Sequence, residues 1–158
     1  MKIYFANALF SQAEINYNAA LAQKIRQLSP QIELYLPQEN GEINNKQAYA
    51  DSKMIAQADT QKLTSSDLLV AILDGNTIDN GVASEIGVAY ANKIPIIGLY
   101  TDSRQQGADN QAKLGALSQI AENQFHYLNL YTTGLIKLNG QIVNNEADLL
   151  KAVQQHLR

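Results

Sequence analysis

The chain has no cysteine and only two histidines, His126 and His156, among its 158 residues. Disulfide bonds, thiolate chemistry and cysteine zinc sites are therefore excluded, and a multi-histidine metal site cannot be assembled. Basic residues are also few, because 12 lysines and arginines stand against 15 aspartates and glutamates, for a net charge of -3. This balance argues against a general nucleic-acid binder, which needs a basic surface.

Several sequence motifs are absent as well. No apolar run approaches the ~20 residues of a membrane helix, and the first residues lack the long apolar region of a signal peptide, so we expect a cytoplasmic protein. A GxxxxGK[ST] phosphate loop, a GxGxxG fingerprint and a GxSxG nucleophile elbow are missing. An enzyme built on this chain must use carboxylates, hydroxyls, amides or lysines, and we expect it to need neither metal nor cofactor.

What the sequence does contain is an alternation of apolar runs and helical patterns, without a linker between domains. Five strands are predicted, at residues 3–6, 32–36, 67–73, 94–100 and 127–131. Helices are predicted over 11–28, 47–63, 82–92, about 111–121 and 147–157, and a small turn or ribbon over 134–140. Ser11 followed by Glu14 fits a capping box at the start of the first helix.

This alternation predicts one α/β domain over residues 1–158. The nearly unbroken apolar run at 67–73 is typical of a central parallel strand covered on both faces. Five strands favour a flavodoxin-like, doubly wound parallel sheet of strand order 2-1-3-4-5. In that order, the ligand crevice lies at the carboxyl ends of strands 1 and 3, where the winding reverses.

The segment after strand 3 brings three carboxylates to this crevice, namely Asp74, Asp79 and Glu85. Carboxylates that lie close together push their pKa values apart, so one can stay ionised while another holds a proton near neutral pH. Enzymes that break glycosidic bonds use this arrangement. Each residue could also have a purely structural role. Capping the next helix could be the sole role of Asp79, Asp74 could be a turn residue, and Glu85 could be a surface glutamate.

Three residues near strand 1 could complete the crevice. Tyr4 could hydrogen-bond a carboxylate across it, or it could simply pack in the core. Asn7 and Phe10 lie just beyond the strand, where a flat ligand ring could stack, although Phe10 could equally be a hydrophobic staple for the first helix. The two crevice loops contain no lysine or arginine, so an uncharged polar ligand fits better than a phosphorylated one.

Residues 73–91, with the sequence LDGNTIDNGVASEIGVAYA, resemble the nucleophile region of the nucleoside 2-deoxyribosyltransferase family. The segments KIYFA at 2–6, GLYTDSR at 98–104 and LNLY at 128–131 resemble the same family in the same order. The resemblance therefore covers nearly the whole chain. The first loop, ANALF at 6–10, departs from members that place glycine or tryptophan there, which indicates a base pocket of different shape.

The resemblance implies a role for each matching position. Glu85 would be the nucleophile, Tyr4 would orient its carboxylate, and Asp74 would serve the base as proton donor. Asp79 would bind the deoxyribose hydroxyls. Asn129 would reach from one subunit to the 5′-hydroxyl of the sugar bound in a neighbouring subunit. The complete set of substrate-binding residues that we expect is Asp79, Asn129, Asn7, Phe10 and Gly81.

The activity implied by the resemblance is transfer of 2-deoxyribose from a 2′-deoxynucleoside to another purine or pyrimidine base, a reaction of nucleotide salvage. It would proceed by double displacement through a covalent deoxyribosyl-Glu85 ester, with retention at C1′. The implied assembly is a homo-oligomer, commonly a hexamer, and neither nucleic acid nor membrane is an expected partner. Two alternatives stay open: an N-glycosidic hydrolase of (deoxy)nucleosides or nucleotides from the same superfamily, and a non-catalytic flavodoxin-like binding domain.

Overall fold

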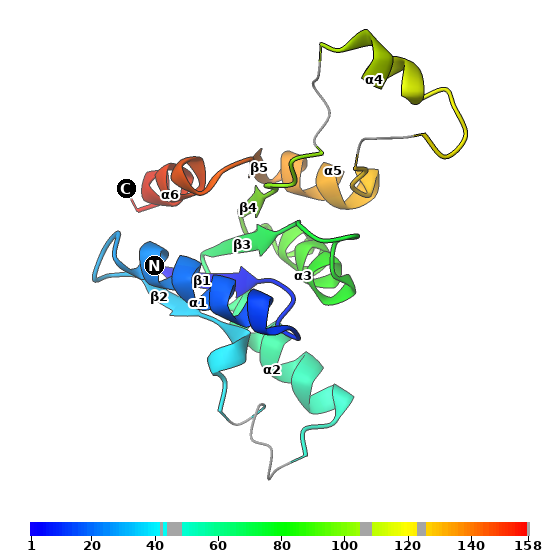
Figure 1. Ribbon diagram of the computed structural model, residues 1–158. Coiled ribbons are helices and arrows are strands. Elements are labelled where there is room, and N and C mark those ends of the chain that lie inside the picture. The colour runs from blue at the N-terminus through cyan, green and yellow to red at the C-terminus, as the bar shows by residue number, and fades with distance from the viewer. Residues whose placement is uncertain (42, 44–48, 105–108, 123–125, 158) are drawn as a thin grey trace.

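The structure is a computed structural model of the chain, and it describes all residues except 42, 44–48, 105–108, 123–125 and 158 (Figure 1). One sheet of five strands runs through the centre, and every neighbouring pair of strands is parallel. The strand order β2-β1-β3-β4-β5 confirms the predicted fold class. The strands are β1 (Lys2–Ala6), β2 (Glu33–Tyr35), β3 (Leu68–Ile72), β4 (Ile96–Leu99) and β5 (Gly140–Val143).

Helices connect the strands, and the α-helices begin at polar caps. The predicted capping box is present, because the Ser11 side chain accepts from the Glu14 backbone N–H and Glu14 accepts from the backbone N–H of Ser11. The helices are α1 (Gln12–Arg26), the short 3₁₀ helix η1 (Pro37–Glu39), α2 (Ser52–Thr64), α3 (Asn80–Ala91), α4 (Gln111–Ala116), α5 (Leu130–Leu138) and α6 (Glu146–Gln155). The helix predicted from residue 47 begins at Ser52, and residue 47 lies outside the described residues.

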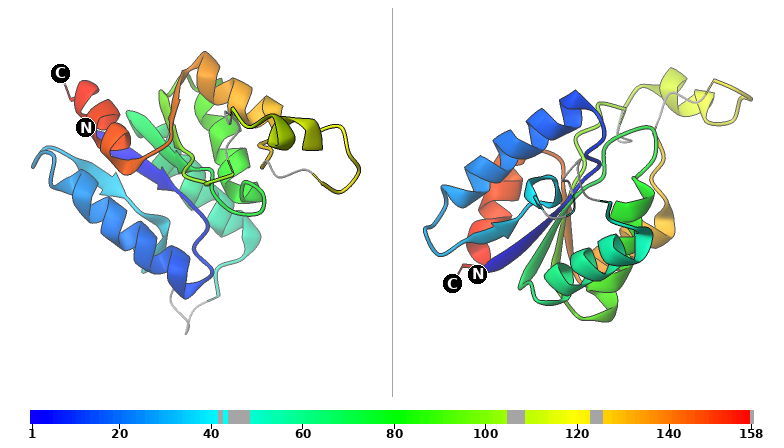
Figure 2. Two further views of the ribbon diagram at one scale, coloured as in Figure 1. Left: turned by 45° about the horizontal axis from the view of Figure 1, so that its top comes forward. Right: turned by 90° about the horizontal axis from the view of Figure 1, so that it is seen from below.

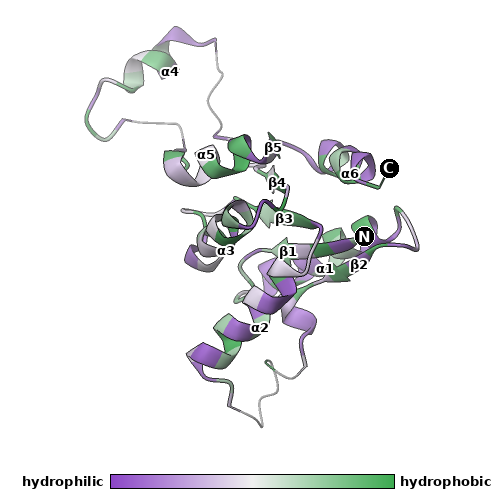
Figure 3. Cartoon of the chain, turned by 180° about the vertical axis from the view of Figure 1, so that it is seen from behind, coloured by the Kyte–Doolittle hydropathy of each residue, from purple (hydrophilic) through white to green (hydrophobic). Residues whose placement is uncertain are grey.

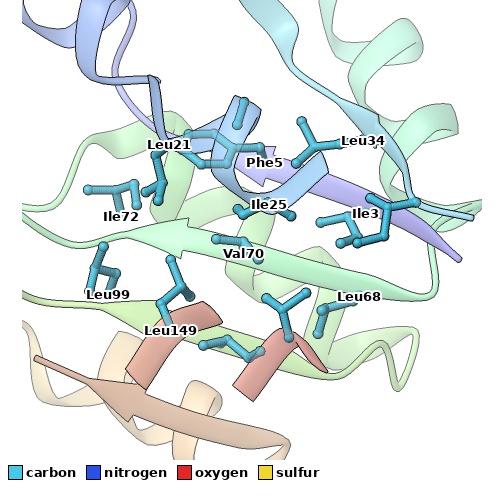
Figure 4. Close-up of a cluster of buried hydrophobic side chains, with 14 of the residues drawn as sticks. Ile3, Phe5, Leu21, Ile25, Leu34, Leu68, Val70, Ile72, Leu99 and Leu149 are labelled. Carbon is cyan, nitrogen blue, oxygen red and sulfur yellow. The ribbon is translucent and has the colours of Figure 1, made fainter. Parts of the chain in front are cut away.

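The helices form a layer on each face of the sheet (Figure 2). Helices α1 and α6 cover one face, where their side chains pack on β1, β3 and β4 (Figure 4). Helices α2, α3 and α5 cover the other face. Side chains alternate along β1, so Ile3 and Phe5 enter the first layer while Tyr4 and Ala6 enter the second. Strand β3 is buried along its whole length, as its apolar run predicts.

The fifth strand is not where the sequence pattern placed it. Residues 127–131 form no strand, and the turn or ribbon predicted over 134–140 is largely helix α5, with β5 following at Gly140–Val143. The Asn129 side chain accepts from the Thr132 backbone N–H over 3.1 Å, which caps α5 at its start. The prediction was wrong because so short an apolar run does not distinguish a strand from the start of a helix, and here most of its apolar residues are exposed.

The segment between β4 and α5 carries α4 away from the sheet and its helices, as both Figure 1 and Figure 2 show. None of the helices in the described part of the chain combines the length and the apolar character that crossing a lipid bilayer requires.

Strand β5 can pair with β4 only because residue 140 has no side chain. A Cβ at Gly140 would lie 1.8 Å from the carbonyl oxygen of Ile96, its register partner. We expect Gly140→Ala to lower the free energy of unfolding by about 3 kcal/mol or more, because overpacking alone costs about 1–3 kcal/mol and here the clash is with backbone. Urea denaturation measures the change.

Gly134→Ala is the matched control, because a Cβ at Gly134 within α5 meets no atom within 4 Å. We expect this variant to be as stable as the wild type or more stable by up to about 1 kcal/mol, since alanine loses less conformational freedom in a helix. Equal stabilities for the two variants would contradict the pairing of β5 with β4.

Candidate active site

Tyr4 and Glu85, which the sequence suggests as partners, meet across the second layer of the core. The Tyr4 hydroxyl donates a hydrogen bond to Glu85 Oε1 over 2.5 Å. Tyr4 comes from the middle of β1 and is fully buried, whereas Glu85 comes from α3 and keeps part of its surface in solvent. The tyrosine therefore holds one carboxylate oxygen from the protein side.

The surroundings of Glu85 bring its ionisation close to neutral pH. Burial is the main reason that the pKa of Glu85 rises to about 7, and the charges of Asp59 and Asp79 act in the same direction. The hydrogen bond from Tyr4 opposes them and lowers the Glu85 pKa. Burial and the nearby Glu85 carboxylate raise the pKa of Tyr4, so Tyr4 stays a neutral donor. A carboxyl group shifted in this way is typical of a functional site.

A second tyrosine–carboxylate pair, which was not predicted from the sequence, lies beside the first. Tyr35 on β2 is the register partner of Tyr4, and their ring centroids are 5.3 Å apart. The Tyr35 hydroxyl donates to Asp59 Oδ1 over 3.1 Å and accepts from Asn40 Nδ2 over 3.1 Å. Burial raises the pKa of Asp59, while the hydrogen bond from Tyr35 lowers it. Asp59 is thus a second partly buried carboxyl group near Glu85.

One sequence signal could have pointed to Asp59. It lies four residues before Leu63, which is the buried residue of α2. Residues four apart share one face of a helix, so an acidic side chain at this spacing faces the interior rather than open solvent.

Asp79 caps α3, which is the structural role that the sequence also allowed for it. Its Oδ1 accepts from the backbone N–H groups of Gly81 over 2.8 Å and of Val82 over 3.1 Å. A Cβ at residue 81 would lie 3.0 Å from that oxygen, so Gly81 leaves room for the cap. Both hydrogen bonds use Oδ1, and the cap therefore does not occupy Oδ2.

Asp74 holds the loop that follows β4. Its Oδ1 accepts from the backbone N–H groups of Thr101 over 2.6 Å and of Asp102 over 3.1 Å, and its Oδ2 accepts from Thr101 Oγ1 over 2.6 Å. Gly75 turns the chain directly after it, with a φ of 123° that side chains rarely adopt. Both oxygens of Asp74 are thus engaged as acceptors.

The other predicted residues are placed less centrally. Asn7 lies in the loop after β1 and donates from Nδ2 to Asn18 Oδ1 over 2.6 Å. Phe10 is 80% exposed, so its ring neither staples α1 nor packs in the core. Asn129 is exposed at the start of α5, and among the described residues it forms no hydrogen bond with Tyr4 or Glu85.

The chain is similar to known proteins in both sequence and fold. The sequence profile of the nucleoside 2-deoxyribosyltransferase family matches residues 3–145. The structure of a conserved protein from Enterococcus faecalis V583 is 70% identical, with a TM-score of 0.93 over 98% of this chain and 97% of that one. No curated protein matches the chain significantly.

Two more distant structures share the fold. A 2-deoxyribosyltransferase from Bacillus psychrosaccharolyticus is 17% identical, with a TM-score of 0.68 over 95% of this chain and 90% of that one. A 2-deoxyribosyltransferase from Leishmania mexicana is 18% identical, with a TM-score of 0.67 over 98% of each chain. Since the family profile covers most of its length, the chain belongs to the nucleoside 2-deoxyribosyltransferase family.

Proposed function

We propose that this protein transfers 2-deoxyribose from a 2′-deoxynucleoside to another purine or pyrimidine base. The proposal is carried by the 2.5 Å hydrogen bond from Tyr4 to Glu85, because it orients a partly buried carboxylate near the sheet's switch point. Membership of the family supports the same reaction. We place this exchange in cytoplasmic nucleotide salvage, where deoxynucleosides and free bases are the substrates.

The reaction is a double displacement at C1′. The ionised Glu85 attacks C1′ from the face opposite the base, the C1′–N bond breaks, and its electron pair leaves with the base, which takes up a proton. The transition state has oxocarbenium character, which the Glu85 anion stabilises. A nitrogen of the second base then attacks the deoxyribosyl ester, gives up its proton and expels Glu85 as a carboxylate. Two inversions give retention at C1′.

The departing base needs a proton donor, and two carboxyl groups are candidates. Asp74 is the residue to which the family resemblance points, but both of its oxygens accept hydrogen bonds from Thr101 and Asp102. Asp59 lies close enough for its charge to act on the pKa of Glu85, and burial raises the pKa of Asp59 itself. These surroundings favour Asp59 as the donor and Asp74 as the residue that holds the loop after β4.

Asp79 and Asn129 are proposed to bind the sugar. Asp79 lies at the start of the helix that carries Glu85, and its Oδ2 is not used by the helix cap, so it can accept from a deoxyribose hydroxyl. Gly81 gives the Asp79 carboxylate its space. Asn7 and Phe10 line the base side of the crevice in this proposal.

The ester intermediate must be kept from water, and a neighbouring subunit could do this. Leu130, Tyr131 and Leu138 are exposed on α5, and Ile120, which follows α4, is 98% exposed. Both α4 and α5 contain hydrophobic segments, drawn in green in Figure 3. Large apolar side chains exposed on one helix favour an interface with another protein chain. We therefore propose a homo-oligomer, with a hexamer as the expected state, in which Asn129 reaches the sugar 5′-hydroxyl in the neighbouring site.

Glu85→Gln removes the nucleophilic charge but keeps an oxygen that can accept from Tyr4. We expect base exchange to fall by at least about 1,000-fold, since a nucleophile is being removed. Wild-type protein incubated with a deoxynucleoside alone should gain the mass of one deoxyribosyl group on Glu85. Glu33→Gln, on the exposed side of β2, is the control and should keep full activity. An active Glu85→Gln protein would end the proposal.

The same assay, run with and without an acceptor base, separates transfer from hydrolysis. A transferase releases little free deoxyribose when the acceptor is present, whereas a hydrolase releases it at the same rate in both cases.

The pH dependence of kcat/KM should report the ionisation of Glu85, since only the carboxylate attacks. With a pKa of about 7, activity rises with pH on the acid side of the profile. Tyr4→Phe removes the hydrogen bond that lowers this pKa, so the acid limb should move to higher pH and kcat should fall by about 10- to 100-fold.

The control for these profiles is Asp74→Asn, which changes a carboxyl group that is not among the causes of the Glu85 shift. Its acid limb should stay in place. Asp59→Asn should slow donors with poor leaving bases more than Asp74→Asn does, and the reverse order would return the proton-donor role to Asp74. Acid limbs that coincide in wild type and Tyr4→Phe would show that Tyr4 does not tune Glu85.

Subunit complementation tests the shared site. Asn129→Ser keeps a side chain that can cap α5 but shortens the reach to the sugar. Co-expression of Asn129→Ser with Glu85→Gln, each strongly impaired alone, should restore about a quarter of wild-type activity, because mixed pairs of subunits contain one intact site. Asp79→Ala with Glu85→Gln is the control, since both changes lie in the same chain's site, and it should restore nothing. Equal activities in the two mixtures would rule out a site completed by Asn129 of a neighbour.

A further inference from the structure

The loop after β1 is held by a buried chain of side-chain amides. Asn18 on α1 is 1% exposed, and its Nδ2 donates to the Ala8 carbonyl oxygen and to Gln38 Oε1, each over 3.0 Å. Its Oδ1 accepts from Asn7 Nδ2 over 2.6 Å. Gln38 Nε2 in turn donates to the Ile15 carbonyl oxygen over 3.0 Å. A buried polar side chain that is fully satisfied in this way fixes its neighbours.

The backbone carbonyl groups at the two ends of this row of amides determine which amide atoms donate and which accept. The carbonyl groups of Ala8 and Ile15 can only accept, so Asn18 must turn its Nδ2 to the first and Gln38 must turn its Nε2 to the second. Asn18 then has only Oδ1 left for Asn7, and Asn7 must present Nδ2 to α1. The amide of Asn7 therefore cannot flip, and Oδ1 is its remaining acceptor.

The amide chain ties together two loops at the carboxyl edge of the sheet. Asn7 and Ala8 follow β1, and Gln38 lies in η1 directly after β2. Both loops are anchored to α1, which covers the face of the sheet opposite Tyr4 and Glu85. The side-chain amides thus position the loops at the crevice without contacting the Glu85 carboxylate.

We propose that Asn18 is a positioning residue of the nucleoside site, which fixes Asn7 so that its Oδ1 accepts a hydrogen bond from an amino group of the base or a hydroxyl group of the sugar of the bound nucleoside. The proposal rests on the proposed function. Because this contact forms in the ground state and in the transition state alike, its loss weakens binding rather than the chemical step. Loss of the Tyr4 hydroxyl should instead lower kcat and move the acid limb, since Tyr4 acts on Glu85.

The decisive variant is Asn18→Leu, which keeps the side-chain volume and removes the amide. We expect KM for a deoxynucleoside to rise about tenfold, kcat to change less than about twofold and the acid limb of the pH profile to stay in place. Asn16→Leu is the matched control, because Asn16 is an exposed asparagine on the same helix, and it should leave KM unchanged. A wild-type KM in Asn18→Leu, or a fall in kcat with a displaced acid limb, would overturn the proposal.

Gln38→Ala serves as a second variant, in case a leucine at the buried position prevents folding. It removes one of the two acceptors of Asn18 Nδ2, from a half-buried position in η1, and should raise KM in the same direction by a smaller factor. An unchanged KM in Gln38→Ala would equally overturn the proposal.

The choice of nucleoside distinguishes the two sources of the hydrogen bond. If the donor is an amino group of the base, KM rises only for deoxyadenosine and deoxycytidine and not for thymidine. If it is a sugar hydroxyl, KM rises equally for all three. A KM that stays at the wild-type value for every one of them contradicts both.

Binding without chemistry separates this proposal from the proposed function. Calorimetry measures the Kd of deoxyadenosine, deoxycytidine and thymidine for Glu85→Gln protein with and without Asn18→Leu, and we expect the second change to weaken binding about tenfold. If none of these nucleosides binds Glu85→Gln protein at all, the proposed function fails. If they bind equally well to both proteins, only the positioning role of Asn18 fails.

Discussion

A carboxylate that leaves water needs another partner, and Glu85 has the hydroxyl of Tyr4. The two side chains come from β1 and α3, which are separated by 81 positions in the sequence, so their meeting depends on the whole sheet being assembled. Burial raises the pKa of Glu85 to about 7, and the tyrosine limits that rise. A single hydrogen bond thereby connects the packing of the core to the availability of a nucleophile.

The rest of the domain keeps this pair in place. Strand β3 is buried on both faces and gives the neighbouring β1 and α3 a rigid support. The Asp79 cap fixes where α3 begins. On the other face, α1 and α6 pack on the same strands through an apolar cluster that contains no member of the Tyr4–Glu85 pair. The loops that carry Asn7, Asp74 and Asp79 lie at the carboxyl edge of the sheet, where the strands end. Rigid layers and polar loops thus divide the work of folding and binding between them.

The sequence pattern alone gives the order of strands and helices through β4, because each of those elements has a clear apolar period and a cap or a turn at its end. It also places Tyr4 and Glu85 in one crevice, since parallel strands in this order open at a known edge. The pattern fails at residues 127–140, where Leu128, Leu130 and Tyr131 suggest a strand but precede or enter α5, whereas α4 and α6 lie where helices are predicted. A run that short has no period of its own, and the cap at Asn129 decides the outcome.

The sequence by itself determined the α/β class and the absence of cysteine chemistry, and it suggested Tyr4 and Glu85 as partners, which the structure brings together. Only the tertiary structure decided which other carboxyl groups stand near Glu85. The charge of Asp59 raises the pKa of Glu85, whereas Asp74 is not among the causes of that shift. The reason is that the pairing of β2 with β1 places Tyr35 beside Tyr4 and brings Asp59 of α2 to the Tyr35 hydroxyl. Distances across a sheet depend on register and on the helices packed against it, and neither can be read from spacing along the chain.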